Sequence, residues 1–477
     1  MRGYRKLSKA ILSALIVFSV LHAASAKEGG ADKAGPRASV DSTDKRLVIG
    51  DPLKMDLPAI TPGPKIALEE ALRLADERNL SLSAARADIA TARAGLKKTW
   101  APLLPTAQGT MTLTHNDHED SVNMGGGAEM VTRRQNTLQG GIQASMPLVN
   151  AQLWAGVSAG KLGVEVTKLT IENVRQELLL AVAQAFYQAL TARAVIDVQE
   201  NLFRTAQRHY EVAVTRHVSG VGRRLDVIRA RSELVRVRQE LLSAHGAYNN
   251  ARDAMGLLIG KGGLPMPEEG AEPGPPVETE KELVLKAVKK RPDLKLTRKM
   301  VSLNESQLDA SWMQFLPTLN ATWQLTHQFT VPSAFGSQDR SRWSALLTLS
   351  VPIYNQSRYA DLDEKRATLT KAMIEADNAE QNAGLEVRTA RRDYQTSVKQ
   401  LETAKEQAAL SREALLLAQA AYESGTGTSL EVTDANRTSR QDEVTLAIKR
   451  FEIQLALLKL LKLVGEDMSL LGSPPRR

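Results

Sequence analysis

Two acidic residues three positions apart, Glu431 and Asp434, have the types and the spacing of a small charged site in this 477-residue chain. They follow a glycine-containing segment at 424–427, and side chains at positions i and i+3 share one face of a helix. Paired carboxylates attract cations when they line a narrow passage. A lone acidic pair more often belongs to a solvated helix face, so the surrounding elements must decide between the two interpretations.

Other residues that could do chemistry form no convincing site. His115, His118 and His327 lie near acidic residues in the expected loops 115–135 and 327–340, but scattered histidines in such loops are usually solvated. A glycine run at 125–127 lacks the lysine and the helix of a phosphate-binding loop. The chain has no cysteine, and no serine, histidine and acid have the spacing of a catalytic triad. We therefore expect neither an enzyme nor a bound metal or cofactor.

The first 26 residues have the composition of a secretory signal peptide: basic residues, an apolar core from Ile11 to Leu21, and small residues at 24–26. This segment carries four of the eight net positive charges, so we expect no nucleic-acid binding. No later continuous apolar run approaches the roughly 18 residues of a membrane-spanning helix. We expect an exported chain with a flexible leader at 27–64, rich in Gly, Pro, Asp and Lys.

Two sixteen-residue segments, 212 residues apart, are identical at eight positions: WAPLLPTAQGTMTLTH at 100–115 and WMQFLPTLNATWQLTH at 312–327. After each Leu-Pro-Thr, apolar and polar residues alternate, which predicts strands with one apolar and one polar face. Two returning segments alternate in the same way. We expect four strands, at about 105–115, 137–148, 317–329 and 342–353. A soluble sandwich has the same alternation, but the signal peptide and the duplication favour a membrane barrel.

Two long segments without proline follow the strands and predict long helices. Apolar residues repeat with heptad steps from Leu178 to Ala213, as in a coiled coil. Glycines break each segment once, near 219–223 and 424–428, which predicts antiparallel helix pairs. We expect, in chain order, a first repeat at 65–259, a Pro/Gly-rich linker at 260–280, a second repeat at 281–465 and a C-terminal tail at 466–477.

Four strands are too few to close a membrane barrel, since natural barrels begin at about eight. Sheet edges open to lipid would leave backbone groups without hydrogen bonds, at a cost of several kcal/mol each. If these strands span a membrane, several chains must share one barrel. The strands alone permit a dimer or a larger assembly.

This ordered set of features resembles the TolC family of outer-membrane efflux and export proteins, from Ile66 to Gly465. Its most specific parts are the two Leu-Pro-Thr junctions, the strand ends at Pro147 and Pro352, and the turn phrases SGVGRRLDV and SGTGTSLEV. The resemblance implies a mainly α protein with a membrane β-barrel. Three copies would share a twelve-stranded barrel, with long antiparallel coiled-coil helices forming a periplasmic tunnel.

The resemblance also implies a function. The chain would lie in the outer membrane, in contact with its lipid, and extend into the periplasm as a passive exit duct of a tripartite efflux or type I secretion system. Its partners would be a periplasmic adaptor protein and an inner-membrane transporter, and the latter would select the cargo. The alternative is a structural coiled-coil envelope protein, anchored by a small barrel, without transport.

Two groups of site residues follow from the resemblance. Glu431 and Asp434 match acidic positions that ring the closed periplasmic entrance. Asp226 and Tyr422 match positions that hold the entrance shut through hydrogen bonds, with plain coiled-coil packing as the alternative for Tyr422. The family's usual arginine partner on the second turn is absent, because Gly427 stands at its place.

The first turn carries Arg223 and Arg224 instead, so the closed state is expected to be latched differently. The turn residues are candidate adaptor contacts, with helix reversal alone as the alternative: Gly220, Val221, Gly222 and Arg223 in the first turn, and Gly425, Thr426, Gly427 and Thr428 in the second.

Overall fold

The computed structural model describes residues 60–123, 129–260, 262–270, 274, 276–330 and 339–470. The expected signal peptide, the leader before residue 60, the glycine run at 125–127 and the end of the C-terminal tail lie outside the described residues. The chain divides into a unit at 1–56 and a unit at 57–477, and the second is described here by itself.

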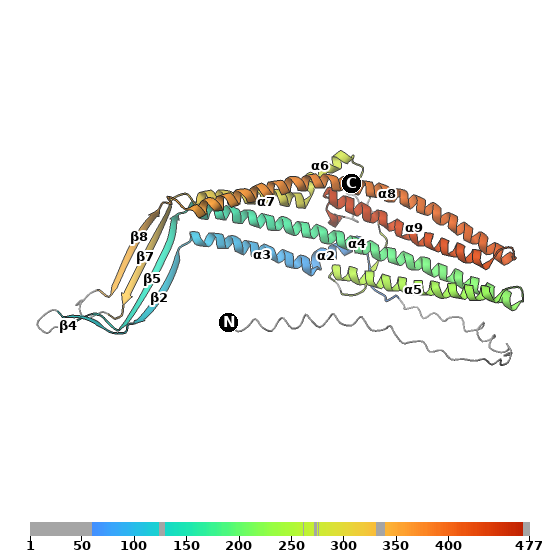
Figure 1. The fold of residues 1–477 in the computed structure, drawn as a ribbon, viewed down its shortest axis with the longest axis horizontal. Coiled ribbons are helices and arrows are strands. Elements are labelled where there is room, and N and C mark those ends of the chain that lie inside the picture. The colour runs from blue at the N-terminus through green and yellow to red at the C-terminus, as the bar shows by residue number, and fades with distance from the viewer. Residues whose placement is uncertain are drawn as a thin grey trace, which may run out of the picture. The chain divides into compact units, whose positions relative to one another are not determined.

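Two successive sets of elements repeat the order helix, helix, strand, strand, helix, helix (Figure 1). The first set comprises β1 (Lys65–Ile66), α2 (Leu68–Arg78), α3 (Leu80–Trp100), β2 (Thr106–His115), β3 (Asp120–Asn123), β4 (Glu129–Arg133), β5 (Asn136–Val149), α4 (Ala151–Val218) and α5 (Arg224–Leu258). The second comprises β6 (Met266–Pro267), α6 (Glu280–Lys290), α7 (Pro292–Met313), β7 (Thr318–Gln328), β8 (Ser341–Ser350), α8 (Gln356–Ser424) and α9 (Ser429–Val464).

The short and long helices at the start of each repeat are separated by a single residue at equivalent positions. Asn79 ends α2 and caps α3, since its side chain accepts a hydrogen bond from the backbone of Leu82 at 3.0 Å. Its amide also donates to the carbonyl of Leu258 at 2.8 Å, which fixes the break against α5. The equivalent Arg291 precedes Pro292, the first residue of α7, where proline is tolerated.

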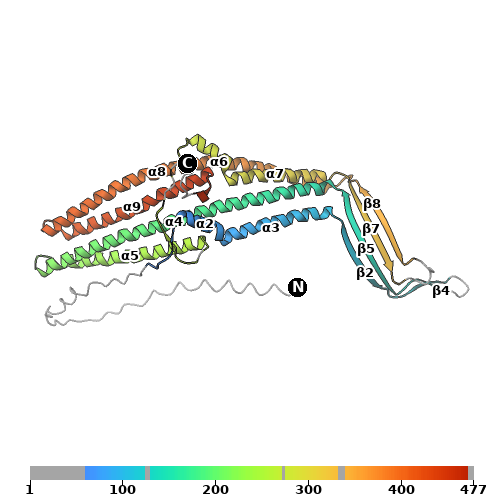
Figure 2. The same ribbon diagram turned by 180° about the vertical axis from the view of Figure 1, so that it is seen from behind.

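The helices α4 and α8 run from the sheet to the opposite end of this unit, and each returns through a tight turn into its neighbour, α5 or α9 (Figure 1, Figure 2). With 68 residues, α4 is about 100 Å long at roughly 1.5 Å per residue. Most members of the expected heptad stripe are buried, including the polar Gln199. The expected antiparallel helix pairs are therefore present in both repeats.

The largest apolar core lies where α2, α4, α5 and α9 meet. Its members on α4 include Leu179, Val182 and Phe186, and Phe451 of α9 packs against them. Contrary to the expectation from continuous runs, α4 contains an 18-residue window apolar enough to cross a membrane, and half of that window is buried within the protein. This apolar character suits the close packing of α4 among its neighbours.

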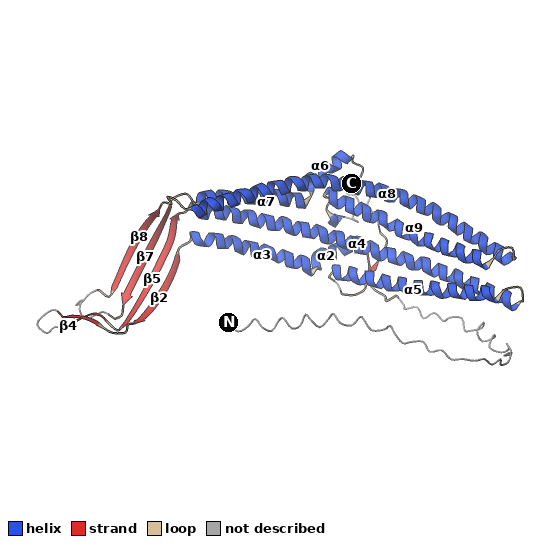
Figure 3. Ribbon diagram, in the orientation of Figure 1, coloured by secondary structure: helices blue, strands red, loops and turns tan. Residues whose placement is uncertain are grey.

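A four-stranded antiparallel sheet continues from the helix ends, with the strand order β2-β5-β7-β8 (Figure 3). Its register aligns the apolar positions across the strands: Ala107 pairs with Ala144, which pairs with Trp323, which pairs with Ala345. The polar residues align likewise, as where Gln108, Gln143 and Gln324 pair. The sheet therefore has one apolar and one polar face, as the alternation predicted.

Among the described residues no other element covers a face of the sheet, and every residue of β2 and of β8 is exposed. Apolar side chains such as Leu113 and Trp343 are 71% and 70% exposed. The expected fourth strand is shorter than predicted and ends at Ser350. Its last pair joins Ser350 to Thr318, the first residue of β7, so the ladder ends where its partner strand begins.

The loop expected at 115–135 contains an additional hairpin, in which β3 and β4 pair antiparallel. The linker also contributes structure that the sequence did not predict. Its strand β6 pairs in parallel with β1, so that Lys65 aligns with Met266 and Ile66 with Pro267. This pairing joins the start of the first repeat to the start of the second.

Aromatic rings mark both junctions between helices and sheet. Trp100 contacts Trp154 edge-on, with ring centroids 5.5 Å apart. In the second repeat Trp312 packs against Phe315 at 6.1 Å, and Phe315 against Tyr359 at 5.1 Å. Aromatic side chains at this level are typical of a membrane–water interface.

Candidate functional site

The first helix turn follows α4, and two glycines set its path. Gly220 has a φ of 80°, a left-handed conformation that residues with a Cβ rarely adopt. Gly222 donates its N–H to the carbonyl of Arg216 at 2.9 Å. A Cβ on Gly222 would lie 3.0 Å from the carbonyl carbon of Arg216, so the turn has room for glycine only.

The second turn repeats this geometry between α8 and α9. Gly425 has a φ of 84°, and Gly427 donates its N–H to the carbonyl of Ala421 at 2.8 Å. A Cβ on Gly427 would lie 2.9 Å from the Cβ of Ala421. An arginine at this place, like any residue with a Cβ, would therefore require the turn backbone to shift.

The eight candidate adaptor contacts lie together on these two turns. Gly222 and Gly427 are half-buried, and the remaining six are exposed: Gly220, Val221, Arg223, Gly425, Thr426 and Thr428. Val221, at 72% exposed, places an apolar side chain in solvent. Contact with an adaptor stays a prediction for all eight.

The acidic pair lies at the start of α9, just after the second turn. Thr428 and Glu431 form a capping box: the Thr428 hydroxyl accepts from the Glu431 N–H at 3.3 Å, and the Glu431 carboxylate accepts from the Thr428 N–H at 3.2 Å. Asp434 is exposed and lies 3.5 Å from Arg437 in an ion pair. The Glu431 carboxylate thus lies in the first turn, where a helix N-terminus stabilises negative charge, and it has a structural task that the sequence analysis overlooked.

The two expected latch residues come from different repeats and lie within electrostatic range of each other. Tyr422, near the end of α8, is only 5% exposed. Burial raises the pKa of its phenol, the Asp226 carboxylate at the start of α5 raises it further, and Arg216 opposes both. The ring contacts of Tyr422 are with Arg216 and His209 of α4. The latch role itself stays a prediction.

Arg216 is the residue that sequence analysis missed at this end of the molecule. Its Nη1 donates to the carbonyl oxygens of Tyr422 at 2.8 Å and of Glu423 at 3.1 Å, and its guanidinium carbon lies 5.0 Å from the centroid of the Tyr422 ring. These contacts join the tip of the first repeat to the tip of the second. Its sequence signal is faint, because Arg216 is one of several basic residues in α4.

His209 lies on the same helix, two turns before Arg216. Its imidazole contacts the Tyr422 ring edge-on, with centroids 5.3 Å apart. Its Nε2 is buried and has no hydrogen-bond partner among the described residues. Burial lowers the pKa of His209, although the carboxylates of Glu233 and Asp226 oppose that shift. The imidazole is therefore held in its neutral form near pH 7.

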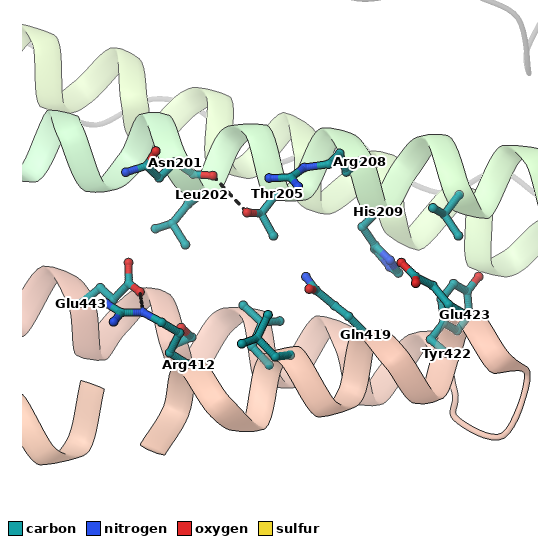
Figure 4. A pocket seen from close by; sticks show the side chains of 14 residues that line it. Asn201, Leu202, Thr205, Arg208, His209, Arg412, Gln419, Tyr422, Glu423 and Glu443 are labelled. Atoms are coloured by element: carbon teal, nitrogen blue, oxygen red, sulfur yellow. Dashed lines mark hydrogen bonds and ion pairs between the residues drawn. The ribbon is translucent and has the colours of Figure 1, made fainter. Parts of the chain in front are cut away.

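His209 and Tyr422 border a cavity of about 290 Å³ between α4, α8 and α9 (Figure 4). Figure 4 shows Gln419 and Tyr422 of α8 facing Thr205 and His209 of α4. At the far end of the cavity, Arg412 bonds to Glu443 at 3.0 Å. The cavity separates the two helical hairpins here, so the aromatic and guanidinium contacts at its end hold the hairpin tips together.

A second link between the hairpins involves buried charges. Arg440 of α9 donates to both carboxylate oxygens of Glu240 on α5, at 2.8 and 2.9 Å. It also lies 4.0 Å from Glu233, which is itself bound by Arg236. Charge pairs therefore connect the two repeats at this level.

The histidines considered as metal ligands bond to separate partners in the sheet region. His115 bonds to Asn136 and His327 to Ser341, both at 2.7 Å across neighbouring strands. His118 lies between Asp117 and Asp120 at 2.9 and 3.2 Å. Within the described part of the chain, no three histidine or acidic side chains are grouped to hold a metal ion.

Comparison with known proteins agrees with this architecture. Over 180 residues, the chain is 29% identical to the outer membrane protein OprJ of Pseudomonas aeruginosa, a match that covers 37% of each chain. It is 23% identical to the cation efflux system protein CusC of Escherichia coli K12 over 291 residues, which are 60% of this chain and 64% of CusC. The matched regions thus span less than two thirds of either relative.

Solved structures share the fold over a larger part of the chain. A crystal structure of CusC matches with a TM-score of 0.72 at 21% identity, covering 84% of this chain and 92% of CusC. The Campylobacter jejuni CmeC outer membrane channel matches with a TM-score of 0.70 at 15% identity, covering 85% and 87%. The profile of the family described as outer membrane efflux protein matches residues 71–261 and 283–466. Because this profile covers both repeats and most of the sequence, the chain belongs to the outer membrane efflux protein family and is an outer-membrane protein that extends into the periplasm.

Proposed function

We propose that this chain forms the outer-membrane exit duct of a tripartite efflux or type I secretion system. Three copies would share one barrel, and their helices would enclose a periplasmic tunnel. A periplasmic adaptor protein would contact the turns at 220–223 and 425–428, and an inner-membrane transporter would deliver the substrate. The substrate would leave chemically unchanged.

The observation that carries this proposal is the four-stranded sheet with two unpaired edges. Within the described residues, β2 pairs only with β5, and β8 only with β7. Unpaired backbone groups cannot remain open to lipid, so a membrane sheet of this kind must close with further copies. Four strands from each of three copies give the twelve-stranded barrel of the proposal.

The faces of the sheet support a duct that conducts. A barrel closed with the apolar face towards lipid would present Gln108, Gln143 and Gln324 to its interior. A structural anchor has no need of a polar interior. The names of two relatives, a cation efflux system protein and an outer membrane channel, also favour conduction.

The acidic pair gives the duct its proposed entrance. Glu431 and Asp434 lie on the first turns of α9, at the end of the unit away from the sheet (Figure 1). Three copies would bring six carboxylates together around one axis. Such a concentration of negative charge would favour cations over anions at the entrance.

Single-channel conductance in a planar bilayer tests the proposal, comparing the wild type with Glu431→Gln combined with Asp434→Asn. Glutamine keeps the capping box with Thr428 while removing the charge, so α9 stays intact. The matched control is Glu282→Gln, which alters the equivalent capping box of Thr279 in α6. We expect a small cation-preferring conductance that loses its preference only in the double variant.

Two results contradict parts of this proposal. Unchanged ion selectivity in the double variant would remove Glu431 and Asp434 from the entrance. The second result is an inserted trimer that conducts neither in its resting state nor after the contact between Arg216 and Tyr422 is removed. That result would instead identify a structural envelope protein.

A further inference from the structure

The two turns have the same backbone path but differ in one side chain that bridges the repeats. Six residues before the second glycine of each turn, the first repeat has Arg216 and the second has Ala421. Both carbonyls accept the N–H of that glycine. Of these two residues, only Arg216 has a side chain long enough to reach the opposite hairpin. The first repeat therefore contacts the second through this side chain, and Ala421 makes no equivalent contact in return.

The target of Arg216 is the C-terminal end of α8. The last carbonyls of a helix lack intrahelical partners and carry partial negative charge, so a cation is favourable there. Arg216 bonds to the carbonyls of Tyr422 and Glu423, and its guanidinium stacks on the Tyr422 ring. A single side chain thus makes both hydrogen bonds and a cation–π contact across the two repeats.

His209 touches the same ring from the same helix. Residues seven apart lie two turns apart on one helix face, so His209 and Arg216 both point from α4 towards Tyr422. A neutral imidazole tolerates this position. An imidazolium would be a second cation on one ring, with a buried Nε2–H that has no acceptor among the described residues.

We propose that Arg216 and His209 form a proton-sensitive clamp on Tyr422, which holds the two hairpin tips of one chain together and releases them when His209 is protonated. Arg216 would then replace the latch arginine that the turn at Gly427 cannot hold. This consequence for the entrance rests on the proposed function. The clamp itself concerns the distance between the hairpins of one chain.

The titratable groups that line the cavity of His209 or act on its charge come from four helices. They are Arg208 and Arg216 on α4, Asp226 and Glu233 on α5, Arg412, Tyr422 and Glu423 on α8, and Glu443 on α9. Glu233 is bound by Arg236, and Glu443 by Arg412, so these carboxylates already have cationic partners. Burial prevails over Glu233 and Asp226 and lowers the pKa of His209.

Because burial lowers the pKa of His209, acid is expected to weaken the clamp. The clamped state binds the proton less readily than a freely solvated histidine, whose pKa is about 6.5. The clamp is therefore stable above that pH and loses stability as the pH falls below it. A difference of one pKa unit between the two states corresponds to a tenfold change in their ratio.

Distance measurements between spin labels test the clamp in the full-length protein reconstituted into vesicles. The chain has no cysteine, so cysteines introduced at the exposed Val218 and Leu417 can be labelled uniquely. Dilution with unlabelled protein restricts the signal to pairs within one chain. Distances at about pH 8 and about pH 5 bracket the titration of histidine.

Single substitutions distinguish the contribution of His209 from that of Arg216. We expect the wild type to have a larger separated fraction at about pH 5 than at about pH 8. His209→Gln should stay clamped at both values, and Arg216→Gln should be separated at both. Arg216→Lys keeps the charge but not the fork of donors, and should be intermediate. Arg204→Gln, an exposed position on the same helix, should behave like the wild type.

Each outcome has one meaning. A pH response that persists in His209→Gln, or a short distance that persists in Arg216→Gln at high pH, overturns the clamp. Loss of folding would appear as loss of helical circular dichroism and is checked against Arg216→Lys. If the distances respond as expected while the inserted trimer conducts neither at about pH 8 nor at about pH 5 in planar bilayers, the clamp stands and the proposed duct fails.

Discussion

Gly222 and Gly427, 205 residues apart, occupy equivalent places in two turns of the same geometry. At each, an added Cβ would lie 3.0 Å from the carbonyl carbon of the residue six positions earlier. Each is preceded by a glycine in the left-handed region, at a φ of 80° or 84°. The duplication thus preserved the backbone requirement of the turn, while the side chains around it diverged.

The first prediction concerns this requirement. Gly427→Ala should lower the unfolding free energy by about 1–3 kcal/mol. The new Cβ would lie 2.9 Å from the Cβ of Ala421, so the turn backbone must shift to remove the clash. Thermal melting of the detergent-solubilised protein measures the change. Gly246→Ala is the control, since a Cβ there meets no atom within 4 Å and alanine favours the helix α5. Equal melting of Gly427→Ala and the wild type would refute the steric argument.

The second prediction concerns acid stability. Burial acts to raise the pKa of Asp293, but the hydrogen bonds and charge of Arg291 outweigh it and lower the pKa. A lowered carboxylate pKa contributes stability that is present above its unfolded value of about 3.9 and is lost as the pH falls through the folded value. The wild type should therefore melt at a lower temperature below about pH 4.

Asp293→Asn isolates this contribution. The variant should lose up to about 1 kcal/mol at pH 7, because Asp293 is partly exposed, and should show a smaller loss on acidification. Asp363→Asn removes an exposed partner of Arg366 and is the matched control. An unaltered acid profile in Asp293→Asn would assign the acid sensitivity to other carboxylates.

The third prediction concerns the buried pair between the hairpins. Arg440→Leu should lower the unfolding free energy by about 2 kcal/mol or more, because it leaves the half-buried Glu240 without the guanidinium that bonds both of its carboxylate oxygens. Arg73→Leu removes one member of the exposed pair with Glu77 and should change stability by less than about 1 kcal/mol. Chemical denaturation of both variants compares them. Similar losses would mean that burial does not strengthen the Arg440 pair.

The fourth prediction tests which face of the sheet meets lipid. Leu347 pairs with Ala321 on the apolar face, and the next residue, Thr348, pairs with Asn320 on the polar face. Leu347→Arg should reduce stability in the bilayer by about 2–4 kcal/mol if it faces the membrane midplane. Thr348→Arg should insert nearly as well as the wild type. Insertion into vesicles decides between them, and the reverse order would invert the assigned faces.

Local patterns in the sequence predicted much of this fold. The four strands were visible as two-residue alternations, because one face is apolar and the other polar. The breaks at Gly220 and Gly425 were visible because few residues other than glycine reverse a helix so tightly. The length of the strand at 341–350 was overestimated, because its ladder ends at Ser350, opposite the first residue of β7, although the apolar alternation reaches Val351.

Long-range contacts were beyond such patterns. Arg216 meets Tyr422 from 206 residues away, and no periodicity reports that distance in space. The pairing of β1 with β6 was hidden likewise, because two-residue strands leave no pattern. The role of Glu431 was accessible, however, since Thr428 and Glu431 have the spacing of a capping box.

The central pair of strands, β5 and β7, belongs to different repeats and joins them within one chain. In the proposed trimer, six hairpins form the barrel, and half of the contacts between hairpins are of this kind. The linker holds those partners at an effective concentration that does not depend on how much protein the membrane contains. Assembly then requires only three encounters between separate molecules, each between β8 of one copy and β2 of the next.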